Sequence, residues 1–122
     1  MMKKKIVIVE DEAIVAMENK MNLTVAGFDV IACYSKGEDV LLHVNQMNPD
    51  LILMDIKLKG NYSGIDTVER MREKNNIPVL FVTGNSDNTT LQQLKVISNT
   101  SYLLKPVLTN DLIIAVKKLL LS

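Results

Sequence analysis

The sequence predicts an α/β domain whose parallel sheet is covered by helices on both faces. Short, wholly apolar runs recur along the chain, as at residues 6–9, 51–54 and 79–82. Runs of this length, bounded by turn residues, are typical of buried parallel strands. Segments with apolar residues at helical spacing lie between them, and no linker, low-complexity tract or internal repeat interrupts the alternation. That alternation favours a single open sheet.

The first half of the chain is expected to alternate strand and helix from its start. Apolar runs predict strands at residues 5–9, 29–34 and 51–55. A helix is expected at residues 12–26 and ends at Gly27, because glycine readily closes a helix. The next helix, at residues 36–47, has an apolar face at helical spacing formed by Val40, Leu41, Val44 and Met47.

The third helix is introduced by a capping signal. Ser63 and Asp66 have the Ser-x-x-acid spacing of a capping box, so we expect a helix that starts there and runs to about residue 75. Pro78 then opens a strand at residues 79–83.

The last elements follow the same order. A helix at residues 87–97 has a polar start rich in Asn and Thr, so we expect it to be the least stable helix. A strand at residues 101–104 is followed by a helix at residues 110–121, and we expect Thr109 to cap that helix.

The first expected helix carries two apolar stripes rather than one. The first stripe is formed by Ile14, Met17, Met21 and Val25. The second is formed by Val15, Leu23 and Ala26. One helix buries one face well, so either the buried face is broad or one stripe is exposed for a partner. We favour the broad buried face.

Length and composition restrict the class of protein. The chain has 122 residues, which suggests one domain spanning residues 1–122. Its 14 basic and 14 acidic side chains give zero net charge, so no long-range field draws it to nucleic acid or to a membrane. The apolar run at residues 6–9 is too short for a signal peptide or a membrane span. The single cysteine, Cys33, is expected in or near the core, and the expected location is the cytoplasm.

Polar residues with useful chemistry follow four of the apolar runs. They are Glu10 and Asp11, then Asp55, Thr83 and Lys105. Any one of them alone would be read as a turn or cap residue. In an open α/β sheet, however, ligands bind at the carboxyl ends of the strands, so all of these side chains are expected to meet.

This set of side chains suits phosphoryl transfer. The carboxylates repel one another and need protons or a cation, and Mg²⁺ prefers such oxygen ligands. A carboxylate such as Asp55 can attack phosphorus once that repulsion is removed. Lys105 can neutralise one phosphoryl oxygen and Thr83 can donate a hydrogen bond to another. Gly84 removes bulk beside the site.

At this point the chain resembles the receiver domain of two-component response regulators, including the single-domain chemotaxis regulators. The resemblance covers residues 6–121. Its motifs are Val9-Glu10-Asp11-Glu12, Leu53-Met54-Asp55-Ile56, Val82-Thr83-Gly84 and Tyr102-Leu103-Leu104-Lys105-Pro106. The resemblance implies a flavodoxin-like (βα)5 three-layer sandwich with strand order 2-1-3-4-5.

The resemblance also implies roles for individual residues. Asp55 would be the phosphoacceptor and Lys105 would contact the phosphoryl group. Mg²⁺ would be held by Asp55, by Asp11 directly, by Glu10 largely through water and by the backbone carbonyl of Lys57.

Further implied features concern the switch and the partners. The Lys105–Pro106 bond would be cis. Thr83 and Tyr102 would form a switch pair that changes the surface formed by the fourth helix, fifth strand and fifth helix. The phosphodonor would be a sensor histidine kinase or a histidine phosphotransfer protein, contacting the first helix and the loops around the site. The output would be a downstream protein or a covalently linked module.

One segment departs from the usual family pattern. After Asp55, many receivers have a proline and a Met-Asp-Gly turn, whereas residues 57–64 here lack proline and are one residue longer. We therefore expect a more mobile loop. Lys57 and Asn85 occupy the two variable positions that tune acyl phosphate hydrolysis in the family.

Other functions remain open on the sequence alone. A phosphorylation-independent pseudo-receiver could have this fold. An aspartate-nucleophile phosphatase typically needs a second acid two residues after the nucleophile, where this chain has Lys57. A flavodoxin would need a phosphate-binding first loop, where this chain has acidic residues 10–12. Ending after the fifth expected helix, the chain is either a free-standing regulator or a piece of a hybrid kinase or larger regulator.

Overall fold

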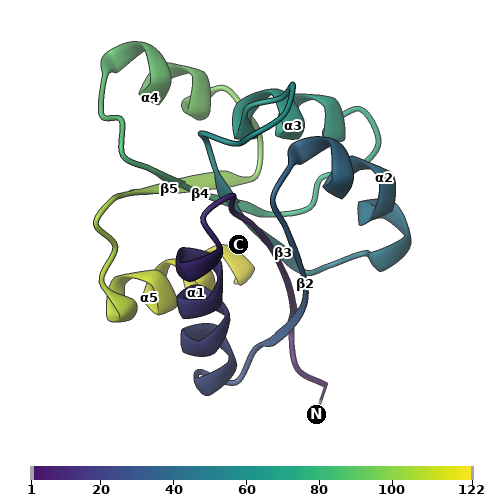
Figure 1. The fold of residues 1–122 in the computed structure, drawn as a ribbon, viewed down its shortest axis with the longest axis vertical. Coiled ribbons are helices and arrows are strands. Elements are labelled where there is room, and N and C mark those ends of the chain that lie inside the picture. The colour runs from purple at the N-terminus through teal and green to yellow at the C-terminus, as the bar shows by residue number, and fades with distance from the viewer. Residues whose placement is uncertain (1, 122) are drawn as a thin grey trace.

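Five parallel strands form one sheet between two layers of helices (Figure 1). The computed structural model describes residues 2–121. The strands are β1 Lys5–Val9, β2 Asp29–Tyr34, β3 Leu51–Asp55, β4 Val79–Thr83 and β5 Thr100–Leu104. The helices are α1 Ala13–Val25, α2 Gly37–Met47, α3 Gly64–Met71, α4 Asn88–Lys95 and α5 Thr109–Leu120. Strand order is β2-β1-β3-β4-β5, as predicted.

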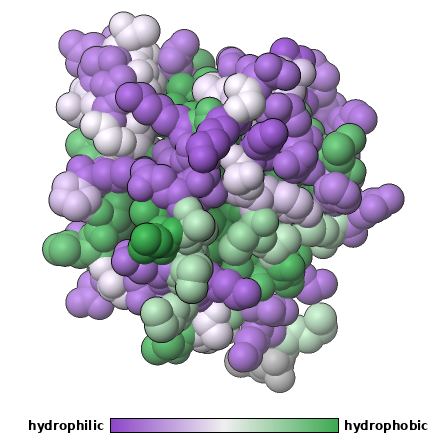
Figure 2. Space-filling model, in the orientation of Figure 1, coloured by the Kyte–Doolittle hydropathy of each residue, from purple (hydrophilic) through white to green (hydrophobic). Residues whose placement is uncertain are grey.

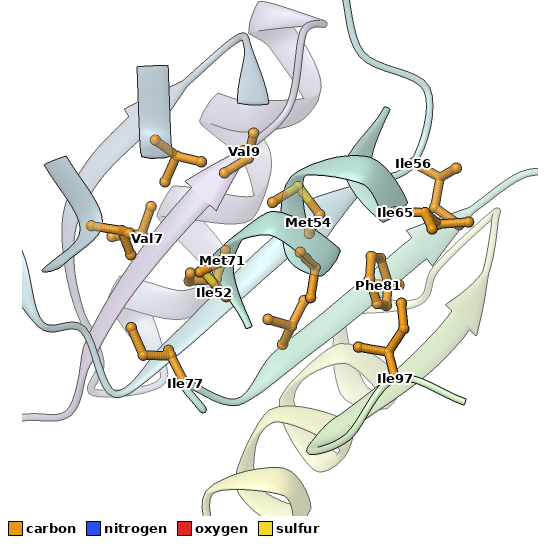
Figure 3. Close-up of a cluster of buried hydrophobic side chains, with 14 of the residues drawn as sticks. Val7, Val9, Ile52, Met54, Ile56, Ile65, Met71, Ile77, Phe81 and Ile97 are labelled. Carbon is orange, nitrogen blue, oxygen red and sulfur yellow. The ribbon is translucent and has the colours of Figure 1, made fainter. Parts of the chain in front are cut away.

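Alternating side chains of the strands divide the core into two clusters. Val7, Ile52 and Phe81 point toward the α2, α3 and α4 side of the sheet (Figure 3). Ile6 and Leu80 belong to the other cluster, which α1 and α5 cover. Because the central strands are buried on both faces, their sequences are continuous apolar runs rather than alternating ones.

The prediction of a broad buried face on α1 is wrong. Ile14, Met17, Met21 and Val25 are all exposed, with relative accessibilities of 62–84%. The helix packs on the sheet through Ala16 and Leu23, which lie on the opposite side of the helix. Figure 2 shows hydrophobic surface gathered over the region of α1 and α5, whereas the region of α2 to α4 is mostly hydrophilic. We call the four exposed residues the α1 stripe.

Two predicted helix boundaries are confirmed by their hydrogen bonds. After α1, Gly27 N–H donates to Thr24 O and Phe28 N–H donates to Leu23 O, at 3.0 Å each. This is the Schellman arrangement, in which a residue of positive φ ends the helix. Before α3, Asp66 N–H donates to Ser63 Oγ at 3.0 Å and Ser63 N–H donates to Asp66 Oδ2 at 3.2 Å. The capping box is therefore present.

Other local predictions are wrong. The N-cap of α5 is Leu108, without a side-chain hydrogen bond, and Thr109 is the first helical residue. Helix α3 ends at Met71, because Lys74 N–H bonds to Met71 O three residues back and tightens the chain into a turn. Cys33 is exposed, since β2 is an edge strand. No helix within residues 2–121 is long and apolar enough to cross a membrane.

Candidate functional site

Three carboxylates meet at the carboxyl ends of β1 and β3. Glu10 and Asp11 follow β1, and Asp55 is the last residue of its neighbour β3. One oxygen from each side chain lies within 4.8 Å of the others. Glu10 and Asp55 are buried, whereas Asp11 is half-buried. The sequence prediction that these acids converge is therefore matched by their positions.

Burial and mutual repulsion make the ionised state of these carboxylates unfavourable unless a positive charge lies close to them. The pKa of Glu10 is raised to about 7, mainly by burial and in addition by the neighbouring Asp55 carboxylate. A hydrogen bond of 3.1 Å from the Glu12 backbone N–H to Glu10 Oε2 opposes that rise. A cluster with these properties favours uptake of a proton or a cation.

Lys105 supplies one positive charge to the cluster. Its Nζ lies 3.3 Å from Asp55 Oδ2 and 3.6 Å from Glu10 Oε1. Burial disfavours the charged amine, but the carboxylates of Asp55 and Glu10 outweigh that effect and raise the pKa of Lys105. One ammonium cannot balance three carboxylates, so the site retains an excess of negative charge.

Thr83 is positioned at the end of β4, between the strands that carry Asp55 and Lys105. Its hydroxyl accepts a hydrogen bond of 3.0 Å from the Asn85 N–H and lies 3.4 Å from the Asn85 carbonyl oxygen, to which it donates. Its own carbonyl accepts the Lys105 N–H at 2.8 Å. That backbone bond holds Lys105 beside the end of β4.

The residues around the constellation form an open cleft of about 520 Å³. Its lining comprises Asp11, Glu12, Asp55, Ile56, Lys57, Thr83, Gly84, Asn85 and Lys105. A Cβ built on Gly84 would meet no atom within 4 Å, so the protein itself leaves room for alanine there. The cleft is large enough for a phosphoryl group with hydrated cation ligands.

Two further features that the resemblance implies concern the chain around Lys105. The Lys105–Pro106 peptide bond is cis. The Tyr102 side chain is half-buried and packs against the same apolar cluster as Phe81, its neighbour in register on β4.

Two important neighbours of the site escaped the sequence analysis. A Cβ on Gly64, the first residue of α3, would clash with the Asp55 carbonyl oxygen. Only glycine allows this approach of α3 to the end of β3. Glu38, on α2, accepts a hydrogen bond from the loop that follows Asp55. The role of Gly64 could have been predicted, because a glycine stands at the first position of a capped helix. Nothing in the sequence around Glu38 indicates its contact with the loop.

The donor set fits Mg²⁺. This ion prefers carboxylate and carbonyl oxygens, retains several waters and is usually held by one or two carboxylates. Asp11, Asp55 and Glu10 provide carboxylate oxygens at the right separation, and the half-buried position of Asp11 leaves access from the cleft. Lys57 also lines the cleft.

Comparison with known proteins defines the family. The family model for the response regulator receiver domain matches residues 6–117. The chain belongs to this family, and its fold and motif positions agree with that membership.

Individual relatives agree with this assignment. The chain is similar to the transcriptional regulatory protein PdtaR of Mycobacterium tuberculosis, at 26% identity over 114 residues, which is 93% of this chain and 55% of PdtaR. The chain thus spans about half the length of that relative.

Solved structures give the same assignment. The signal receiver domain of a modulated diguanylate cyclase from Desulfovibrio desulfuricans G20 has a TM-score of 0.88 and 29% identity, covering 98% of this chain and 94% of that one. A putative response regulator from Chloroflexus aurantiacus has a TM-score of 0.91 and 26% identity, covering 99% of this chain and 100% of that one.

Proposed function

We propose that this receiver domain accepts a phosphoryl group on Asp55 from a phosphohistidine of a sensor kinase or phosphotransfer protein. One observation carries the proposal. Asp55 lies at the end of β3 with two further carboxylates, an ammonium and a hydroxyl around it, all bordering or next to one open cleft. Turn chemistry alone gives no reason for these residue types to meet.

The transfer step uses groups that the chain already holds in place. A carboxylate oxygen of Asp55 forms a bond to phosphorus while the phosphorus–nitrogen bond of the donor breaks. The electron pair leaves with the imidazole nitrogen, which then takes a proton. Lys105, 3.3 Å from Asp55, neutralises a phosphoryl oxygen, and the Thr83 hydroxyl donates to another.

Magnesium belongs to this proposal as the required cation. Asp11, Asp55 and the Lys57 carbonyl would hold it directly, and Glu10 largely through water. When bound, it screens the negative charge between the attacking carboxylate and the phosphoryl oxygens. The chain then acts as a signalling phosphoacceptor, which catalyses only its own phosphorylation and dephosphorylation.

The response to phosphorylation is assigned to Thr83 and Tyr102. If the Thr83 hydroxyl turned toward the phosphoryl group, its hydrogen bonds with Asn85 would break. Tyr102, half-buried beside Phe81, would turn into the space that opens. The surface formed by α4, β5 and α5 would change for a downstream protein or a linked module. The proposed location is the cytoplasm, with no direct contact to nucleic acid or membrane.

Intact mass spectrometry tests the proposal. Native protein and Asp55→Asn are incubated with acetyl phosphate, with and without Mg²⁺. We expect one phosphoryl adduct on the native chain that requires Mg²⁺ and is absent from the variant. An adduct that persists in Asp55→Asn would refute the assignment of the phosphoacceptor.

A native chain without an adduct needs a second measurement. Beryllium fluoride mimics the acyl phosphate without hydrolysis, so its effect on the NMR spectrum separates two explanations. Spectral changes around Thr83 would indicate a short-lived acyl phosphate. An unchanged spectrum would indicate a pseudo-receiver that binds partners without phosphorylation.

A further inference from the structure

The loop between β3 and α3 is anchored along its length rather than free. At its base, Gly64 N–H donates to Ile56 O at 2.8 Å. In its middle, Lys59 pairs with Lys36 in an isolated parallel bridge. Lys36 is the N-cap of α2, so the loop lies beside the start of that helix. The expectation of a more mobile loop was drawn from its lack of proline and its extra residue, and it stays a prediction beside these contacts.

Glu38 makes the tether at the far end of the loop. Its Oε2 accepts the Asn61 N–H at 3.1 Å, and that hydrogen bond is the main reason that the pKa of Glu38 lies below its usual value. Its Oε1 is shielded from solvent and lacks a hydrogen bond of good geometry among the described residues. The carboxylate is therefore directed into the loop rather than into solvent.

Gly60 shows that the loop is shaped around this carboxylate. Its φ is +90°, which side chains other than glycine rarely adopt. A Cβ at Gly60 would lie 2.6 Å from Glu38 Oε2 and 2.9 Å from Oε1. The Gly60 backbone thus approaches the Glu38 carboxylate so closely that only glycine fits at this position.

We propose that Glu38 is a positioning residue for the metal site, holding residues 60–61 so that the Lys57 carbonyl is presented to the cleft. This inference rests on the proposed function, because it requires that Mg²⁺ binds beside Asp55. A backbone carbonyl has no rotamer of its own, so its direction is set entirely by the path of the loop. Lys57 lines the cleft and lies only two residues before the bridge at Lys59.

A role in capping α2 is a weaker account of Glu38. Asp39 lies in the same first turn and already places a negative charge near the helix N-terminus. Among the described residues, Asp39 has no hydrogen bond to the loop, whereas Glu38 does. The two acids therefore share the helix effect but differ in the loop contact, which makes Asp39 a matched control.

The test is direct Mg²⁺ titration by isothermal calorimetry on the native chain, Glu38→Ala, Glu38→Gln and Asp39→Ala. Outer partners of metal ligands typically contribute about 10–100-fold to metal affinity, and we expect a loss on the order of tenfold for Glu38→Ala. Glu38→Gln keeps an acceptor for Asn61 and should recover part of the affinity. Asp39→Ala should bind Mg²⁺ like the native chain.

A second readout follows the loop without metal. Hydrogen exchange of the Asn61 amide should be faster in Glu38→Ala and unchanged in Asp39→Ala. Gly60→Ala, which pushes the carboxylate away, should weaken Mg²⁺ binding as Glu38→Ala does. Native-like Mg²⁺ affinity in both Glu38→Ala and Gly60→Ala would overturn the inference. If the native chain itself binds no Mg²⁺, the proposed metal site fails, and the inference fails with it for that separate reason.

Discussion

Lys105 Nζ lies 3.3 Å from Asp55 Oδ2, although the two residues end strands that are not neighbours. β4 separates β3 from β5, so the lysine side chain passes the end of β4 and Thr83 to reach the acid. The same ammonium lies 3.6 Å from Oε1 of Glu10, which follows β1 on the far side of β3. One side chain therefore links the ends of β5, β3 and β1, and its ammonium pairs with both buried acids.

Removing this cation should destabilise the metal-free protein. Lys105→Met leaves Asp55 and Glu10 without their partner, and the side chain of Lys105 is 31% exposed. Breaking a fully buried pair costs about 3–5 kcal/mol, so partial exposure suggests a loss of about 1–2 kcal/mol. Urea unfolding without Mg²⁺ measures this loss in the free energy of unfolding. Lys74→Met, at an exposed lysine away from the site, is the control. Mg²⁺ should stabilise Lys105→Met more than the native chain, and equal stabilisation would contradict the charge argument.

Gly64→Ala should be strongly destabilising even though alanine favours helices. Alanine gains about 1 kcal/mol in helix propensity over glycine. Its Cβ, however, would clash with the Asp55 carbonyl oxygen, which is backbone and cannot rotate away. Overpacking typically costs about 1–3 kcal/mol, and a clash with backbone lies at the upper end of that range, so after the helix gain we expect a net loss of about 2 kcal/mol.

The control for this prediction is Gly84→Ala, at a glycine that lines the cleft. A Cβ there meets nothing within 4 Å, so its effect on stability should be small. Thermal unfolding of both variants separates the two cases. Equal melting temperatures for Gly64→Ala and Gly84→Ala would show that α3 can withdraw from Asp55 without cost.

The strands and the residues at their ends were predictable because both are local signals. Each buried strand is a continuous apolar run, and parallel strands place their carboxyl ends on one edge. Asp55, Thr83 and Lys105 therefore came together as expected. The tether of Glu38 to Asn61 was not predictable, because it depends on the path of a loop 23 residues further along the chain.

The orientation of α1 was unpredictable for a different reason. Its two stripes have similar apolar character, so hydrophobicity alone does not say which one meets the sheet. The sheet accepts the side with small Ala16 and with Leu23, and the methionines Met17 and Met21 remain outside. The Thr109 cap was wrong by a single residue, a difference that capping preferences alone do not resolve.

Thr83→Ala should separate phosphorylation from its structural response. The variant loses a buried hydroxyl that bonds to Asn85, which should cost about 1 kcal/mol of stability. Asp55 and Lys105 remain, so a phosphoryl adduct should still form. Beryllium fluoride should then cause much smaller NMR shifts at Tyr102 than in the native chain. Thr83→Ser, which keeps the hydroxyl, should retain them, and full-sized shifts in Thr83→Ala would remove Thr83 from the switch.

The start of α4 should fray in acid. Asp87 accepts the Thr90 N–H at 2.7 Å, and this bond is the main cause of its lowered pKa. A carboxyl whose pKa is lower in the folded protein stabilises it above the unfolded value of 3.8, and the contribution disappears as pH falls through the folded pKa. The protection factor of the Thr90 amide, which corrects for the pH dependence of the intrinsic exchange rate, should therefore fall as pH drops through the folded pKa of Asp87. Asp87→Asn should show no such dependence, since asparagine caps without titrating.

The α1 stripe should affect phosphotransfer from a protein donor but not from a small one. Met17 is 69% exposed and packs on neither core cluster, so Met17→Glu should leave the fold and the site intact. A minority of interface residues each contribute more than about 1 kcal/mol, and about 1.4 kcal/mol corresponds to about tenfold in affinity. We therefore expect kcat/KM for a phosphorylated kinase or phosphotransfer protein to fall about tenfold, with an unchanged rate from acetyl phosphate. Leu42→Glu on α2, where the native residue is 74% exposed, is the matched control and should change neither rate. Equal losses by both routes in Met17→Glu would show that the substitution has disturbed the domain itself, and the docking assignment would fail.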